Sequence, residues 1–372
     1  MTQTQRSIVF LGLSLSSSWG NGHATTYRAL LRGLAERGHA VSFLERDVPW
    51  YAANRDLADP DFCRLSFYRD VDELALLHDQ VIAEADAVIV GSYVPDGAQV
   101  IRHALARAGG IVGFYDIDTP VTLAGLARGD CAYLKPELVP ELDVYFSFTS
   151  GPALVRLERD YGARLALPLH CMVDERCYRP TGESPLWDLG YLGTYSADRQ
   201  PALERLLIEP ARRLPERRFV VAGPQYPETL QWPSNVDRID HVPPDRHPSF
   251  YGQLRYTLNI TRADMKEAGW SPSVRLFEAA ACGTPVITDR WDGLGDFFPE
   301  GEAILAADDD DDVVAVLSDT RRPGLAERVA LRARWITLSR HTGHHRAEEL
   351  EAGLDRARAL RSSVVANGED AA

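Results

Sequence analysis

The sequence predicts an α/β protein made of two doubly wound domains, each built around a parallel sheet. Three observations indicate this fold class. Short apolar runs typical of buried strands alternate with amphipathic helical stretches along most of the chain. The alternation forms two series, separated by a segment near 172–181 that has neither pattern. The length of 372 residues also fits two domains of ordinary size.

The first series begins with a strand at Ile8–Leu11, a loop rich in glycine and serine, and a helix. From Tyr27 onward, apolar residues recur at i, i+3, i+4 and i+7, so they share one helix face. Gly38 ends this helix, and the next strand is expected at Val41–Leu44. Two strands joined by one helix imply a parallel pair. Further strands are expected at 87–90, 111–114, 144–148 and 165–167, with helices at 100–108 and 152–161.

The second series repeats the alternation. Its expected strands are 189–192, 219–222, 238–241, 257–260 and 285–288, with helices at 201–213, 248–255 and 272–282 and a long final helix at 345–361. We therefore expect a first domain at 1–172, a linker at 173–183, a second domain at 184–345, and a terminal helix and tail at 346–372. Ligands of doubly wound sheets bind beyond the carboxyl ends of the strands, so the site is expected in a cleft between the domains.

The chain is acidic, with 40 Lys and Arg residues against 54 Asp and Glu residues and a net charge of −14. This balance disfavours nucleic acid as a partner, because the chain repels a phosphate backbone. Five scattered cysteines without metal-ligand spacing are typical of a reduced cytoplasmic protein and predict no metal site. No stretch approaches the ~20 apolar residues of a membrane span. The run Asp308–Asp312 lacks the spaced ligands of a calcium loop, so we interpret it as a helix cap.

The strongest motif runs from Ser271 to Pro285. Ser271 and Pro272 suit the N-cap and first position of a helix, and Gly283 suits its end. The first free N–H groups, near Ser273 and Val274, then form an anion site that needs no side chain. The motif therefore predicts phosphate binding at the start of this helix.

Three polar residues of this helix share one face. Ser271, Arg275 and Glu278 are spaced at i, i+4 and i+7, while the apolar residues between them point to the core. A carboxylate two turns from a phosphate site can accept hydrogen bonds from a ribose diol. The alternative is a surface helix with an Arg–Glu ion pair, which contributes only about 0.2–0.5 kcal/mol.

The stretch 277–287 resembles the nucleotide-sugar motif of GT-B glycosyltransferases, which implies that Glu278 binds the ribose of the donor. Residues 220–223 resemble the strand and glycine turn of the family's donor domain, so Gly223 is assigned to donor binding. Residues 189–193 resemble its first strand and phosphate loop, which adds Gly193 and Thr194. Residues 173–180 resemble the interdomain linker. The combination of 258–262 with 271–278 is similar to the spore-maturation (CgeB-type) branch.

The resemblance implies two Rossmann-like domains facing a cleft and transfer of a sugar to an acceptor hydroxyl. The donor is expected to be UDP-, dTDP- or GDP-linked, the acceptor a small molecule or glycan, and the reaction metal-independent without a cofactor. In one respect the sequence departs from the family: many retaining members carry two glutamates separated by seven residues, and the first of these positions is Trp270 in this chain. Because this glutamate is missing, although Glu267 is close in sequence, the stereochemical outcome stays open. Two rivals are a nucleotide-sugar 2-epimerase on this fold and a catalytically silent binding protein.

His23, in the loop segment 20–25, is one candidate base. The positive end of a helix dipole favours neutral imidazole there, which suits a general base, and inverting GT-B enzymes have a similar Gly-His in this loop. The alternative is a capping histidine. Asp116 and Asp118, after a strand and before Pro120, can bind acceptor hydroxyls, act as the base or hold a metal. Their alternatives are an Asx-turn and a helix cap.

Arg262, at the end of the strand 257–260, can neutralise the leaving diphosphate. Its alternative is an ion pair with Asp264 or Glu267. Trp19, Trp50 and Tyr51 lie on loops of the first domain near strand ends. They can stack on an acceptor, or they can serve packing alone.

Overall fold

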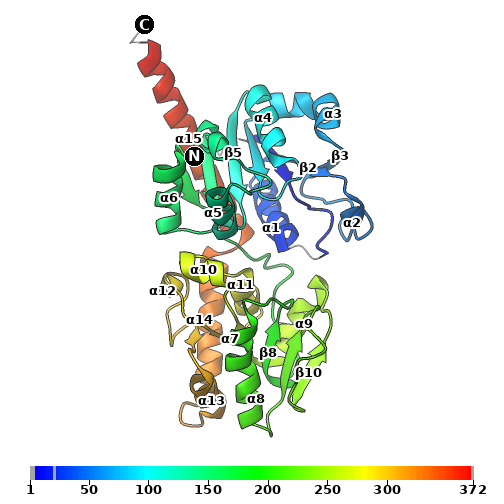
Figure 1. The fold of residues 1–372 in the computed structure, drawn as a ribbon, viewed down its shortest axis with the longest axis vertical. Coiled ribbons are helices and arrows are strands. Elements are labelled where there is room, and N and C mark those ends of the chain that lie inside the picture. The colour runs from blue at the N-terminus through cyan, green and yellow to red at the C-terminus, as the bar shows by residue number, and fades with distance from the viewer. Residues whose placement is uncertain (1–4, 20–21, 370–372) are drawn as a thin grey trace. The chain divides into compact units, whose positions relative to one another are not determined.

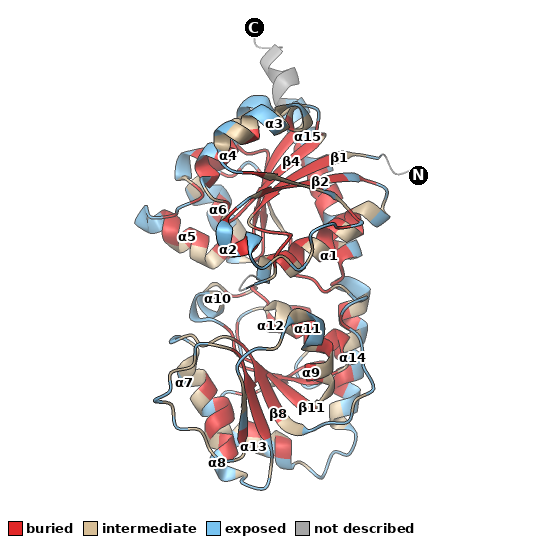
Figure 2. Cartoon of the chain, turned by 90° about the vertical axis from the view of Figure 1, so that its right-hand side faces the viewer, coloured by how far each residue is buried: buried red, intermediate tan, exposed pale blue. Residues whose placement is uncertain are grey.

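The computed structural model describes residues 5–19 and 22–369. It has two parallel sheets with helices on both faces (Figure 1), so the predicted α/β class with two doubly wound sheets is confirmed. The chain divides into two compact units: Met1–Met172 with Thr342–Ala372, and Val173–His341. The strands form the buried centre of each unit (Figure 2).

The first unit contains a seven-stranded sheet in the order β3-β2-β1-β4-β5-β6-β7. The strands are β1 Ser7–Gly12, β2 Ala40–Arg46, β3 Arg64–Tyr68, β4 Ala87–Gly91, β5 Ile111–Asp116, β6 Val144–Ser147 and β7 Ala166–Pro168. The helices are α1 Gly22–Glu36, α2 Pro49–Ala52, α3 Val71–Ala83, α4 Gly97–Arg107, α5 Thr119–Arg128, η1 Pro136–Glu141, α6 Pro152–Tyr161 and α15 Gly343–Glu369. The strand order reverses between β1 and β4, and a doubly wound sheet binds ligands at such a point.

The second unit contains a six-stranded sheet in the order β10-β9-β8-β11-β12-β13, which reverses between β8 and β11. The strands are β8 Trp187–Leu192, β9 Phe219–Ala222, β10 Val236–Ile239, β11 Leu254–Asn259, β12 Val286–Thr288 and β13 Leu305–Ala306. The helices are α7 Gln200–Leu203, η2 Glu204–Ile208, α8 Glu209–Arg213, η3 Pro244–Arg246, α9 His247–Gly252, α10 Ala263–Ala268, α11 Val274–Ala281, α12 Leu294–Phe297, α13 Asp310–Ser318 and α14 Leu325–Arg340.

Several predicted boundaries are wrong. β10 begins two residues before the expected 238–241, and the helix expected at 248–255 ends at Gly252, because Leu254 already pairs with Trp187 in the sheet. The edge strand β3 was missed because its residues are mostly half-buried and lack a continuous apolar run. The aspartate run is a helix cap as predicted: Asp309 accepts a hydrogen bond from the Asp312 N–H at the start of α13.

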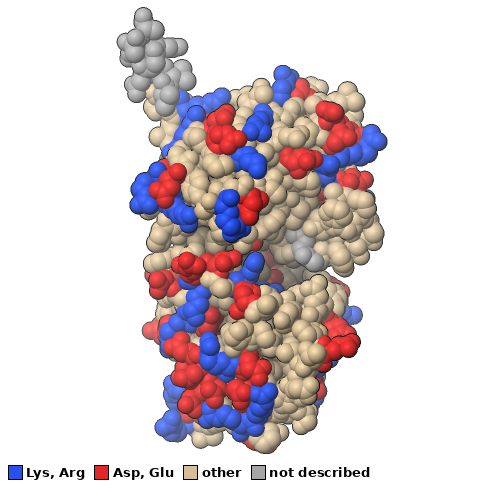
Figure 3. All heavy atoms as spheres, viewed as in Figure 1, with Lys and Arg blue, Asp and Glu red and all other residues tan. Residues whose placement is uncertain are grey.

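The surface charges are mixed rather than segregated. Acidic and basic side chains lie interspersed over the face drawn in Figure 3. Many form ion pairs, such as Arg213 with Asp311 at 2.7 Å. No helix among the described residues is long and apolar enough to cross a membrane. Within residues 5–19 and 22–369, no group of three or more His, Cys, Asp or Glu side chains is placed to hold a metal ion.

The last helix, α15, packs against α1 and belongs to the first unit, although it follows the whole second unit in sequence. From the sequence, this helix was expected to form a separate terminal segment at 346–372. Buried ion pairs hold it: Glu351 accepts hydrogen bonds from Arg37 at 2.5 and 2.9 Å and lies 2.7 Å from His39. Arg346, which is 1% exposed, donates to the carbonyl of His170 at 3.0 Å.

Two glycines set the distance between α1 and α15. A Cβ on Gly343 would lie 2.1 Å from the carbonyl oxygen of Ala29, and a Cβ on Gly33 would lie 2.3 Å from that of Gly343. We expect Gly343→Ala to lower the free energy of unfolding by about 1–3 kcal/mol, because a backbone clash cannot be relieved by changing a rotamer. Chemical denaturation measures this. The control is Gly295→Ala, where a Cβ meets nothing within 4 Å; equal stability of both variants would contradict the prediction.

Candidate functional site

The residues predicted to bind the donor gather at the carboxyl edge of the second sheet. Gly193 and Thr194 follow β8, Gly223 follows β9, and Arg262 follows β11. The carboxyl ends of parallel strands meet at one edge, and β8 and β11 are the neighbours at which the strand order reverses. The predicted donor residues are therefore placed where a doubly wound sheet binds its ligand.

The loops after β8 and β9 touch through their glycines. Gly223 has a φ of +148°, and a Cβ on it would lie 2.1 Å from the carbonyl oxygen of Gly193. The Tyr226 hydroxyl donates to that same carbonyl at 3.1 Å, and Arg199 donates to the Thr194 carbonyl at 2.9 Å. Only glycine fits at position 223, and the side chains around it hold the two loops rigidly.

An arginine between two aromatic rings also supports this edge. The Arg238 guanidinium lies 4.2 Å from the ring centre of Tyr226 and 4.4 Å from that of Trp232. It donates hydrogen bonds to the carbonyls of Val221 and Gly223 at 3.0 and 3.2 Å. No sequence pattern indicated this arginine, because its partners lie in β9 and in the irregular loop that follows it.

Helix α11 starts two residues later than predicted. Ser273, with φ −74° and ψ 140°, is the N-cap residue, and its side chain makes no capping hydrogen bond. Ser271, the predicted N-cap, is instead buried ahead of the helix, and Pro272 lies outside it. A residue before proline favours extended backbone, which keeps Ser271 out of the helix. The expected anion site thus begins at Val274, one residue further along than predicted.

Glu278 is buried on α11, with 4% of its surface exposed. The Tyr251 hydroxyl is 3.5 Å from its Oε2 atom. Burial and the charge of Glu278 raise the pKa of Tyr251 and of Tyr178 well above the ordinary value, and burial lowers the pKa of the nearby His247. Among the described residues, Arg275 has no carboxylate within 4.0 Å, so the surface Arg–Glu pair considered above is not formed.

Arg262 is exposed at the start of α10, and the turn that contains it is held by hydrogen bonds to a buried carboxylate. Asp289, 3% exposed, accepts hydrogen bonds from the Thr261 N–H at 3.0 Å and from its hydroxyl at 2.9 Å. Lys266, one turn along α10, has its ammonium 3.4 Å from the other oxygen of Asp289. Sequence analysis missed Asp289 and Lys266. The only available signal for Lys266 was that the chain has just two lysines.

Trp270, which stands where the resemblance expects a glutamate, has a strained backbone with φ +43°. Its N–H donates to the Asp292 carbonyl at 2.6 Å, and its indole N–H donates to Asp296 at 2.7 Å. The ring lies against Gly293, where a Cβ would come within 2.5 Å of it. A bulky residue keeps a positive φ only where its surroundings force it to.

The candidate bases gather at the carboxyl edge of the first sheet. His23 is the second residue of α1, whereas Gly20 and Asn21 of its predicted loop lie outside the described residues. The imidazole packs edge-on against the Tyr93 ring, with 5.4 Å between ring centres. Burial lowers the pKa of His23 to about 4, so its ring is neutral at pH 7.

Asp116 and Asp118 have different surroundings. Asp116 is fully buried and accepts hydrogen bonds from the Tyr145 hydroxyl at 2.6 Å and the Thr122 hydroxyl at 2.7 Å. It also accepts the Asp118 N–H at 3.3 Å, which is the Asx-turn considered above. Burial raises its pKa to about 6. Its oxygens are engaged by the protein, so Asp116 holds the loop together.

Asp118 is only partly buried. It is the N-cap residue of α5, as the cap interpretation predicted, but its side chain makes no capping hydrogen bond. Its carboxylate instead accepts a hydrogen bond from the Tyr93 hydroxyl at 2.9 Å. Tyr93 therefore touches both His23 and Asp118, although the sequence analysis did not identify it. A lone tyrosine after a strand gave no sequence signal.

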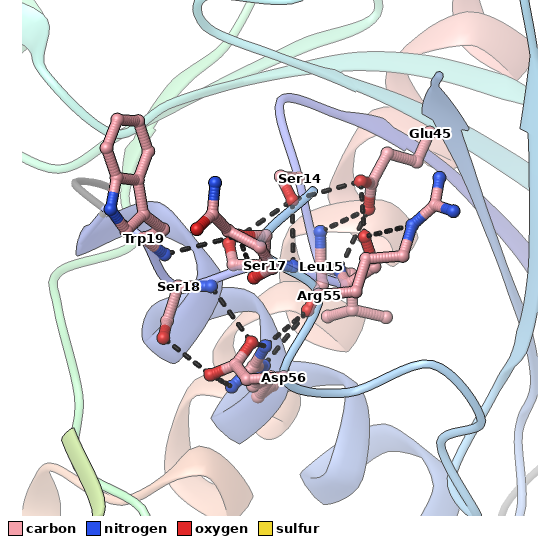
Figure 4. Close-up of polar contacts among 11 residues, drawn as sticks. Ser14, Leu15, Ser17, Ser18, Trp19, Glu45, Arg55 and Asp56 are labelled. Carbon is pink, nitrogen blue, oxygen red and sulfur yellow. Dashed lines mark hydrogen bonds and ion pairs between the residues drawn. The ribbon is translucent and has the colours of Figure 1, made fainter. Parts of the chain in front are cut away.

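A buried carboxylate shapes the serine-rich loop before His23 (Figure 4). Glu45, at 0% exposure, accepts hydrogen bonds from the hydroxyls of Ser14 and Ser16 at 3.0 and 2.7 Å. It also accepts the N–H groups of Leu15 and Ser16 at 2.6 and 2.9 Å. The loop is thus rigid up to Trp19, whose side chain is 56% exposed and stands clear of this network in Figure 4.

Several solved structures are similar to this chain over nearly its whole length. Sucrose-phosphate synthase from Thermosynechococcus elongatus has a TM-score of 0.65 at 13% identity, over 96% of this chain and 100% of that one. HepE of Anabaena, in complex with UDP and glucose, has a TM-score of 0.66 at 12% identity over 95% and 100%. The chain has the GT-B glycosyltransferase fold.

The family comparison covers most of the second unit and the start of α15. Residues 199–352 match the family described as glycosyl transferase-like. An E. coli trehalose-6-phosphate structure bound with UDP-2-fluoro glucose is also similar, with a TM-score of 0.62 at 11% identity over 94% of this chain and 98% of that one. No curated protein matches the chain. The GT-B fold is thus established, while membership of the spore-maturation branch stays a prediction.

Proposed function

We propose that this protein is a glycosyltransferase that moves a sugar from a nucleoside-diphosphate donor to an acceptor hydroxyl. The observation that carries the proposal is Glu278, a buried carboxylate on α11, a helix that packs against β11 and β12 of the second sheet. It lies within the segment that matches the glycosyl transferase-like family. UDP and UDP-glucose are bound in the similar HepE structures, which favours a UDP-sugar as donor.

In this proposal the second unit holds the donor. The N-terminus of α11, from Val274, and the side chain of Arg275 meet the phosphates, because a helix start favours negative charge. Glu278 accepts hydrogen bonds from the ribose diol. Gly193 and Thr194, in the loop after β8, contact the donor, and Gly223 supports that loop. The reaction as proposed needs no cofactor, and positively charged side chains stabilise the leaving diphosphate.

Arg262 is the residue we assign to the leaving diphosphate. Arg262→Ala should lower kcat by roughly 10²-fold or more with little change in KM, because the charge it stabilises develops in the transition state. UDP release from UDP-glucose, with water as the acceptor of the glucosyl group, measures both constants. Arg212→Ala is the control, since Arg212 pairs with Glu204 on the surface. A rise in KM alone would make Arg262 a ground-state binding residue.

The first unit supplies the acceptor side of the proposed reaction. His23 is neutral and partly buried at the ligand edge of its sheet, so it can accept the acceptor proton. Trp19 and Trp50, 56% and 53% exposed, are available to stack on an acceptor, whereas Tyr51 is buried and serves packing. The acceptor is proposed to be a small molecule or glycan.

A thermal-shift screen of UDP-, dTDP- and GDP-sugars tests the donor class. Selective stabilisation by one nucleotide family at saturating concentration is the expected result. Product analysis with the stabilising sugar then separates the alternatives. A 2-epimerase consumes the sugar nucleotide without an acceptor, a silent binding protein leaves it unchanged, and a glycosyltransferase releases the nucleoside diphosphate while it transfers the sugar to an added acceptor hydroxyl or, more slowly, to water. No stabilisation by any of these donors would overturn the proposal.

A further inference from the structure

Tyr93 occupies a strained position between two loops of the first unit. It follows β4, whose sheet neighbours are β1 on one side and β5 on the other. Its φ of +63° is left-handed, a conformation that a large L-residue adopts only when its contacts require it. The preceding Ser92 is tied to the β5 loop, because its hydroxyl accepts the Ile117 N–H at 3.0 Å.

The contacts that fix Tyr93 are made with the two candidate site residues. Its hydroxyl donates to Asp118 at 2.9 Å, and its ring meets the His23 ring edge-on at 5.4 Å between centres and 74° between planes. The Tyr93 ring also packs against Tyr133, whose ring centre lies 4.7 Å from that of Tyr93. Tyr93 therefore cannot turn without moving against the imidazole or losing its bond to the carboxylate.

The neighbouring titratable groups also have hydrogen-bond partners of their own. Tyr133 shares a hydrogen bond with the Thr122 hydroxyl at 2.6 Å, and that hydroxyl donates to Asp116 at 2.7 Å. Tyr145 donates to the other oxygen of Asp116. Asp116 thus stabilises the loop through these hydrogen bonds, and Asp118 is the carboxylate that accepts a hydrogen bond from the Tyr93 hydroxyl.

We propose that Tyr93 is a positioning residue: it is held by Asp118 and in turn fixes the orientation of the His23 imidazole. Asp118 therefore acts through Tyr93 and does not itself take the acceptor proton. The Tyr93 ring also keeps water from one side of His23. This inference rests on the proposed function for its effect on turnover, but the packing of His23 can be tested without any substrate.

A double-mutant cycle tests the linkage. Tyr93→Phe keeps the ring and loses the hydroxyl, so UDP release from UDP-glucose should slow by about 10-fold, with the KM for UDP-glucose unchanged. Asp118→Ala, which removes the acceptor of this hydrogen bond, should cost a similar factor, and the double variant should be no slower than the slower single variant, because the two residues share one hydrogen bond. If Asp118→Asn abolishes turnover while Tyr93→Phe remains active, Asp118 is the base and the proposal is wrong.

NMR titration of His23 gives a readout that does not depend on activity. Tyr93→Leu removes the ring, so the pKa of His23 should rise from about 4 towards its ordinary value of 6.5 as water reaches the imidazole. Tyr68→Phe is the control: it removes another buried tyrosine hydroxyl of the same unit, one that has no hydrogen-bond partner among the described residues.

The outcomes separate failure of this inference from failure of the proposed function. An unchanged His23 pKa in a folded Tyr93→Leu variant overturns the positioning role, whatever the turnover. A shifted pKa in a protein that releases no UDP supports the packing role and counts against the glycosyltransferase function. A lower melting temperature with normal turnover and normal His23 titration makes Tyr93 a purely structural residue and also overturns the inference.

Discussion

Replacing His23 with alanine should lower kcat by about 10²–10⁴-fold while nucleotide binding stays intact. The loss is expected because His23 is the neutral, partly buried nitrogen base at the ligand edge of the first sheet, whereas Asp116 is already engaged by Tyr145 and Thr122. Steady-state UDP release and calorimetric titration with UDP measure the two quantities separately. The control is His103→Ala, because His103 lies on α4 and its side chain is close to Asp79 of α3.

The pH dependence of the native protein sharpens this prediction. A general base works when it is unprotonated, so kcat/KM should fall as pH drops through the pKa of His23. An ordinary histidine would place that fall near 6.5, but burial moves the pKa to about 4. We therefore expect kcat/KM to stay flat from pH 8 down to about 5 and to fall below that, provided the protein stays folded.

The base assignment is wrong if the His23→Ala variant remains active and Asp116→Asn or Asp118→Asn collapses. If all three variants keep most activity, the donor phosphate itself is the better candidate for the base. Front-face chemistry of that kind would retain the configuration of the sugar. In that case the absence of a glutamate at Trp270 matters less than the sequence comparison suggests.

Replacing Glu278 with alanine should weaken nucleotide binding by about 2–4 kcal/mol. The carboxylate is buried beside Tyr251 and Tyr178, where water competes poorly with a ribose diol for its oxygens. Calorimetric titration with UDP measures the loss. UDP that lacks the ribose 2′-hydroxyl should bind the native protein more weakly than UDP, by part of the same free energy. The variant should bind the two nucleotides equally.

Folding must be checked in this variant because the Glu278 side chain is buried on α11. An unchanged melting temperature and circular dichroism spectrum show that the loss belongs to binding. Glu204→Ala, which removes a surface carboxylate paired with Arg212 in the same unit, should bind UDP normally. A folded Glu278→Ala variant with native affinity for UDP would remove Glu278 from the site.

Much of the fold could be predicted because it depends on local periodicity. The central strands and the helices that cover them carry continuous apolar runs or one apolar face, so β1, β4, β5, β8 and β9 were located within a few residues. Elements with mixed polarity, such as β3 and the helix α14, were missed. Their burial depends on neighbours that a local pattern does not contain.

The sequence by itself determined the fold class, the segment that matches a donor-binding motif and the identity of the residues at its strand ends, because each depends on residues close together in the chain. Tertiary structure alone decided how Asp116 and Asp118 differ, since the hydroxyls that engage them belong to Tyr145 on β6 and to Tyr93 in the loop after β4. It also decided that Glu45 anchors a loop 31 residues earlier and that α15 returns to the first unit. Hydrogen bonds between distant segments leave no periodic signal, so only the folded chain shows which polar residues are already engaged and which face a ligand.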